Sequence, residues 1–121
     1  MGEDHDVEKV VEELVKKLKE ERVSVDCFNI PQILVLTPET LTVTKLYKAI
    51  RDKYTKEDNV RVFKLFARHV AIKEHEKVLS AKPKGNVINV YIGTPNRVRA
   101  LASCKAINVM SPDFKTLVFD C

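Results

Sequence analysis

Apolar residues recur at helical spacing near the start of the chain. The apolar residues Val7, Val10, Val11, Leu14, Val15 and Leu18 recur at this spacing, and Glu and Lys residues occupy the positions between them. Such a stripe is typical of an amphipathic helix that buries one face. We expect a helix over residues 4–22 that covers a sheet, in preference to a partner-binding helix, although the pattern does not fix where it docks.

Short apolar runs and helical stretches alternate along the rest of the chain. The continuous run Ile33–Leu36 is typical of a parallel strand that is buried on both faces. The helix after it should bury one face, formed by Leu41, Val43, Leu46, Tyr47 and Ile50. The other expected elements are strands over residues 62–66, 87–92 and 116–120 and helices over residues 72–79 and 95–103.

This alternation predicts an α/β fold, with a mostly parallel sheet flanked by helices and joined by right-handed crossovers. The 121 residues are enough for one layered core and too few for two, so we expect a single domain over residues 1–121. No apolar run approaches membrane-spanning length, and the acidic start is unlike a secretory signal. We therefore expect an intracellular protein with no membrane partner.

The junction between the third strand and its helix has the features of a phosphate-binding turn. Thr94 suits the N-cap and Pro95 suits the first helical position, so backbone N–H groups of the first turn should point outward beside Arg97 and Arg99. Ligands of parallel sheets bind at the carboxyl ends of the strands. We expect the junctions there to converge, namely residues 37–38, 67–69, 93–95 and 120.

Charge is unevenly distributed. Between Val60 and Lys105 ten Lys and Arg residues face only Glu74 and Glu76, whereas the first 22 residues hold eight acids and five bases. On charge alone, a nucleic-acid footprint and an ordinary solvated surface stay equally open. The same alternatives apply to Arg97, and Thr94 will act as a helix cap in either case.

The sequence lacks the motifs of a metal site, a disulfide framework and a P-loop ATPase. Cys27, Cys104 and Cys121 have no Cys-x-x-Cys spacing, and the three histidines have no metal-ligand spacing, so we expect neither a metal nor a disulfide framework. Glycine occurs at three positions, none of them in a Gly-x-x-x-x-Gly-Lys pattern. Because that loop cradles the phosphates in P-loop enzymes, we expect no ATP cofactor and no ATPase activity.

Three segments resemble motifs of DEAD-box RNA helicases. Thr94–Arg97, a Thr-Pro-x-Arg turn after a strand, is similar to motif Ib, and Leu117–Asp120 is similar to the start of motif II. Gln32–Leu41 resembles motif Ia. The run Lys64–His69 together with Gly93–Pro95 looks most like the Cms-type small-subunit ribosome biogenesis factors, which are helicase-like proteins without a working ATPase.

The resemblance implies a partial RecA-like, P-loop-type domain that lacks the P-loop. In the family pattern, the residues matching Thr94 and Arg97 touch the RNA backbone, although Asn96 replaces the usual glycine. Motif Ia keeps its proline, but Glu39 and Thr40 replace the usual Thr-Arg pair, and Cys121 stands where motif II has its second acid. The candidate RNA-binding residues are Thr94, Arg97, Arg99, Arg68, His69, Lys64, Pro38 and Thr40.

We therefore expect a non-catalytic RNA-binding factor of pre-ribosomal small-subunit assembly, located in the nucleolus or nucleus. Its expected partners are RNA and other small-subunit assembly factors. An alternative is a protein-interaction adaptor without nucleic-acid binding, in which the first helix or a sheet edge meets a partner. An ATPase completed by another chain is a remote third hypothesis. The sequence leaves the particular RNA and the oligomeric state open.

Overall fold

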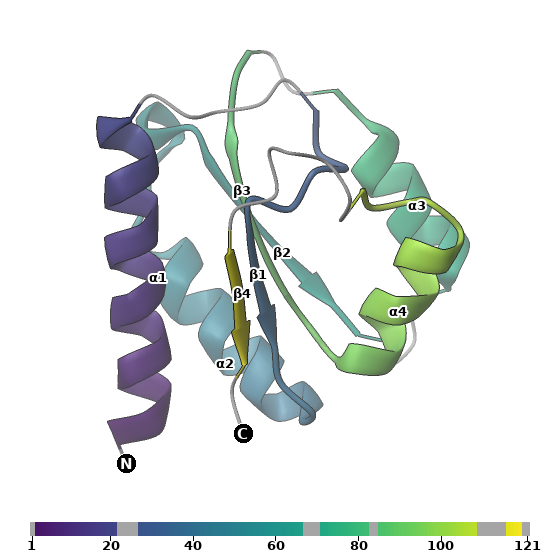
Figure 1. Cartoon of the computed structure of the whole chain (residues 1–121), viewed down its shortest axis with the longest axis horizontal. Helices are drawn as coiled ribbons and strands as arrows, with labels where there is room; N and C mark the ends of the chain where they lie inside the picture. Colours follow the sequence, from purple (N-terminus) through teal and green to yellow (C-terminus); the bar gives the residue numbers. More distant parts are fainter. Residues whose placement is uncertain (1, 22–26, 67–70, 83–84, 109–115, 120–121) are drawn as a thin grey trace.

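The chain folds into a parallel β-sheet with helices on both faces (Figure 1). The computed structural model describes residues 2–21, 27–66, 71–82, 85–108 and 116–119. Its elements are α1 (Gly2–Glu20), β1 (Ile33–Leu36), α2 (Thr40–Arg51), the 3-10 turn η1 (Lys56–Asp58), β2 (Val60–Leu65), α3 (Ile72–Ser80), β3 (Ile88–Gly93), α4 (Pro95–Ser103) and β4 (Thr116–Phe119). The expected α/β class and the parallel sheet are confirmed.

The four strands lie in the order β2-β3-β1-β4, and every neighbouring pair is parallel. Gly93, at the end of β3, is in register with Leu36 of β1 and with Leu65 of β2. The carboxyl ends of these three strands therefore meet at one edge of the sheet. Every residue of β3 is buried, as expected for a central strand covered on both faces.

Alternate residues of the strands supply two separate cores. On one face, Ile33, Val35 and Val90 pack with the buried stripes of α1 and α2. On the other face, Leu34, Leu65 and Tyr91 pack with α3 and α4. Figure 1 shows α1 and α2 on one side of the sheet and α3 and α4 on the other. The sheet is thus the middle layer of three.

The N-terminal helix covers the sheet, as its apolar stripe predicts. Val11 and Val15 are fully buried in the core shared with α2. Ion pairs fasten its polar side, because Lys53 Nζ lies 2.9 Å from Glu8 Oε1 and 2.5 Å from Glu12 Oε1. These two carboxylates raise the pKa of Lys53 above its ordinary value. Val7, Val11, Val15 and Leu18 of the stripe are used inside the domain, whereas Val10 is 41% exposed, so its expected place on the buried face was wrong.

Some boundaries and a second core assignment differ from expectation. The helix begins at Gly2 and ends at Glu20, β2 begins at Val60 instead of Val62, and β3 runs one residue further, to Gly93. Leu41 is 63% exposed, so its expected place on the buried face of α2 was wrong. Val43, Leu46 and Ile50 are the buried stripe, and a residue two positions before Val43 lies on the opposite side of a helix.

A buried amide fastens the loop that leads into β1. The Asn89 Nδ2 group donates hydrogen bonds to the carbonyls of Cys27 and Ile30, at 2.8 and 2.9 Å. The Asn89 backbone N–H donates to Gln32 Oε1 at 2.9 Å. Buried polar groups are stable in a core only when they are paired, so this network ties the loop to the centre of the sheet.

Among the described helices, none is both long and apolar enough to span a membrane.

Candidate nucleic-acid interface

The junctions after β1, β2 and β3 meet at the carboxyl edge of the sheet. The Thr37 N–H donates a 3.0 Å hydrogen bond to the Gly93 carbonyl, and the Thr94 N–H donates a 3.0 Å bond to the Leu65 carbonyl. The expected convergence is confirmed for residues 37–38 and 93–95, whereas Ala67–His69 and Asp120 lie outside the described residues. Helices α2 and α4 both begin at this edge (Figure 1).

Gly93 permits the close approach of β3 to β2 at this edge. A Cβ atom on Gly93 would lie 2.6 Å from the Leu65 carbonyl oxygen and 2.9 Å from Val98 Cγ2. The first atom belongs to the β2 backbone and the second to a buried side chain, and neither can move freely. The glycine is therefore required by packing, and it sets the position from which α4 starts.

The first turn of α4 is not capped by a side chain. Thr94 occupies the N-cap with extended backbone angles, and its carbonyl accepts the Val98 N–H at 3.0 Å. Its hydroxyl oxygen accepts no hydrogen bond from a backbone N–H of the turn, which corrects the prediction of a side-chain cap. No described residue accepts the N–H groups of Asn96 and Arg97, so these donors can bind an anion.

Arg97, on the same turn, is held in place by α3. Its Nη1 lies 3.3 Å from Nδ1 of His75, and the side chain is half-buried. A guanidinium has no acceptor, so Arg97 donates this bond and the His75 proton resides on Nε2. No carboxylate among the described residues pairs with Arg97. Because charges that leave water are normally paired, a half-buried cation without a carboxylate favours a bound anion.

The setting of His75 lowers its pKa and so favours its neutral form. Burial lowers its pKa first, and the positive charge of Arg97 lowers it further, while Glu74 opposes the shift. The neutral imidazole is the form that accepts the Arg97 hydrogen bond. His75 therefore acts as a support for the guanidinium, and the charge that faces the ligand belongs to Arg97.

The remaining candidate residues are dispersed. Arg99 is exposed, but it is two positions from Arg97 and therefore on a different side of α4. Pro38 is exposed and Thr40 is half-buried at the start of α2, where the Glu39 side chain makes no cap hydrogen bond. Lys64 lies on the opposite face of the sheet from Arg97. Arg68 and His69 lie outside the described residues.

The position of Lys64 follows from its contact with α2. Its ammonium group lies 5.0 Å from the ring centroid of Tyr47, and Arg51 lies over the same ring at 5.2 Å. A cation over an aromatic face is attracted by the electrons of the ring. The structure therefore places Lys64 in a cluster with α2 and does not bring it together with Arg97 and His75.

Comparison with known proteins identifies the family of this chain. A family model described as "CMS1: U3-containing 90S pre-ribosomal complex subunit" matches residues 4–121. The chain belongs to the CMS1 family. A relative, "Protein CMSS1" from Xenopus laevis, is 36% identical over 81 residues, which are 67% of this chain and 25% of that protein. The match to this CMS1 relative thus spans a quarter of the relative's length.

The sequence of this CMS1-family chain did not indicate the contacts that two residues, His75 and Tyr47, make in the structure. His75 was expected only to lack metal-ligand spacing, and Tyr47 was expected only to supply the apolar face of a helix. The signal for His75 was its helical spacing from Leu79, because both are buried residues on one face of α3. Among the described residues, no cluster of His, Cys, Asp and Glu is arranged to hold a metal ion.

Proposed function

We propose that this chain is a non-catalytic, RNA-binding part of a CMS1-family factor that acts in 90S pre-ribosome assembly in the nucleolus. RNA phosphates bind at the carboxyl edge of the sheet, against the first turn of α4. Arg97 contacts a phosphate directly, Arg99 flanks it, and Pro38 and Thr40 lie beside the path at the start of α2. The family description and the geometry of this turn support the proposal.

The observation that carries the proposal is the pairing of Arg97 with His75. The guanidinium is half-buried, fixed by a neutral imidazole, and without a carboxylate partner among the described residues. The free N–H groups of the adjoining turn add the positive end of a helix dipole to the same place. Phosphate contacts of this kind give binding that depends weakly on base sequence.

We further propose that the fold is a degenerate part of a RecA-like domain. Parallel strands, helices on both faces and three converging strand ends support this interpretation, as do the helicase-like residues at the start of α4. Glycine is found only at positions 2, 85 and 93 of the sequence, so no glycine-rich phosphate loop is available. The role of the chain is therefore to bind and position RNA, without ATP hydrolysis.

The experiment is a salt titration of RNA affinity. Fluorescence anisotropy with a labelled single-stranded RNA of about 20 nucleotides, longer than most single-domain sites, gives Kd at several salt concentrations. We expect affinity to fall steeply as salt rises, because released counterions drive binding. Arg97→Ala should lower the slope of log K against log salt by about one unit.

A matched cation elsewhere supplies the control. Lys16→Ala removes an exposed charge from α1, on the other face of the sheet, and should leave the slope unchanged. If Arg97→Ala binds RNA like the parent at every salt concentration, the turn of α4 is structural and the proposal fails. Far-ultraviolet circular dichroism of each variant verifies that the fold is intact.

The adaptor hypothesis keeps one supporting observation, which concerns the sheet edge and not the first helix. Most of the apolar stripe of α1 is buried in the domain core, so this helix offers no free apolar face. Strand β2, in contrast, is the last strand of the sheet on its side.

A further inference from the structure

Strand β2 presents an unpaired backbone edge. The carbonyls of Asn59 and Leu65 accept hydrogen bonds from the β3 side, namely from the N–H groups of Ile88 and Thr94. Successive residues of a strand direct their N–H and C=O groups to opposite sides. The backbone groups of Val60, Val62 and Lys64 therefore point away from β3, and no described strand pairs with them.

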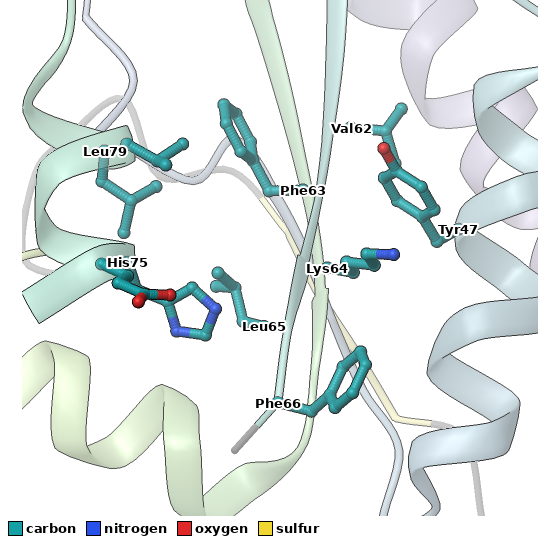
Figure 2. Close-up of a pocket in the computed structure, with 10 residues that line it drawn as sticks. Tyr47, Val62, Phe63, Lys64, Leu65, Phe66, His75 and Leu79 are labelled. Carbon is teal, nitrogen blue, oxygen red and sulfur yellow. The ribbon is translucent and has the colours of Figure 1, made fainter. Parts of the chain in front are cut away.

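An apolar groove of about 290 Å³ runs along this edge and includes side chains from both faces of β2. Tyr47, Val62 and Phe66 line it on the α2 side, whereas Phe63, Leu65 and Val78 line it on the α3 side. Figure 2 shows this division, with Phe63 and Leu65 pointing toward one helix and Val62, Lys64 and Phe66 toward the other. Val78, beside the groove, is 50% exposed.

This combination matches an added β-strand better than a compact ligand. A strand lying beside β2 would satisfy the outward N–H and C=O groups, and its alternate side chains would enter the two halves of the groove. Natural edge strands are commonly protected by shortness, a bulge, proline or charged side chains. Of these devices β2 has charges, namely Arg61 and Lys64, and Lys64 lines the groove. At six residues β2 is as long as the central strand β3, and it contains no proline.

The charges of the groove select the chemistry of that strand. Lys64 lines the α2 side and lies over the Tyr47 ring, and no described carboxylate pairs with it. Arg51, over the same ring, is paired with Asp52 and does not line the groove. On the α3 side the charged lining residue is Glu74, beside the neutral His75. A carboxylate of the incoming strand is therefore favoured on the α2 side and disfavoured on the α3 side.

We propose that the β2 edge binds an extended segment of a partner protein, which adds to the sheet as a further strand. Its apolar side chains enter the α3 half of the groove, and an Asp or Glu side chain faces Lys64 in the α2 half. A second copy of this chain fits less well, because pairing two β2 strands would bring the cations of both edges together. The proposal does not rest on RNA binding, although His75 both lines the groove and holds Arg97.

The test follows amide hydrogen exchange by NMR in the ¹⁵N-labelled 121-residue chain. The probe is a synthetic peptide of about ten residues, long enough for an average strand, with valine at alternate positions, threonine between them and a central glutamate. The matched peptide has a central lysine. We expect the glutamate peptide to slow exchange of the Val62 and Lys64 amides, while the Phe63 amide, which faces β3, is unchanged.

Variants assign the contact to the groove. Lys64→Glu should lower the affinity for the glutamate peptide and raise the affinity for the lysine peptide, each by roughly 3- to 10-fold. Val78→Glu should lower the affinity for both peptides. Val10→Glu places the same change on an exposed valine of α1 and should leave both affinities unchanged.

Several results would overturn the proposal. They are the lack of any protection at Val62 and Lys64, equal binding of the two peptides to the parent chain, and protection that arises from self-association without peptide. Protection of the same amides by RNA in place of peptide would assign the groove to nucleic acid.

Discussion

Gly93 and Thr94 are neighbours at the carboxyl edge, but their side-chain positions carry different constraints. Gly93→Ala places a methyl group against the Leu65 carbonyl oxygen, so we expect the free energy of unfolding to fall by about 1–3 kcal/mol, as for other overpacked sites. Thr94→Ala removes a hydroxyl group that makes no cap hydrogen bond, so it should cost less than about 0.5 kcal/mol. Urea denaturation of the two variants measures both values. Similar losses in the two proteins would contradict this account.

His75 makes stability depend on pH. Its pKa in the folded protein is below the ordinary value of about 6.5, so near that pH the unfolded chain binds more protons than the folded one. The free energy of unfolding should therefore fall as pH drops through about 6.5, and the loss should end below the pKa of the folded state. His75→Gln lacks this contribution. Urea denaturation between about pH 7.5 and 5.5 should show a larger loss in the parent than in the variant.

At the scale of elements, the docking of α1 can be tested with two adjacent valines. Val11 is fully buried against α2 and the sheet, whereas Val10 is 41% exposed on the same helix. Val11→Ala leaves a small cavity in the core and should lower the free energy of unfolding by about 1–3 kcal/mol. Val10→Ala, the control, should change it by less than about 0.5 kcal/mol. Equal effects would mean that α1 is not docked as described.

The elements themselves were largely predictable, because local patterns determine them. The Thr-Pro start signal gave α4 its observed bounds, Pro95–Ser103, and the apolar run Ile33–Leu36 is the observed β1. Leu41 was misassigned because its apolar character was given more weight than its helical position, which is two residues before Val43 and opposite the buried stripe. The β3 end needs Gly93 for a contact with Leu65, 28 positions earlier in the chain, which no local pattern shows.

The arrangement of the elements was less predictable, because it depends on contacts between distant segments. Alternation of strands and helices indicated a parallel sheet, but it did not show that β2 lies at one edge of it. The pairing of Arg97 with His75 joins α4 to α3, and nothing in the spacing of these residues indicates it. The position of Lys64 on the α2 face likewise follows from the alternation of side chains between the two faces of β2, but only once the helices on each face are known.

At the scale of the whole molecule, Arg97 and Lys64 lie on opposite faces of one sheet and should act independently on RNA binding. Arg97 is supported by α3, and Lys64 lies over Tyr47 of α2. Lys64→Ala should therefore leave the salt slope of RNA binding unchanged, and the double variant with Arg97→Ala should match Arg97→Ala alone, since separate sites contribute additively. The measurement is the anisotropy titration of the four proteins. A slope lowered by about one unit in Lys64→Ala would mean that RNA passes around the end of β2 onto the α2 face, in which case the groove belongs to the RNA path.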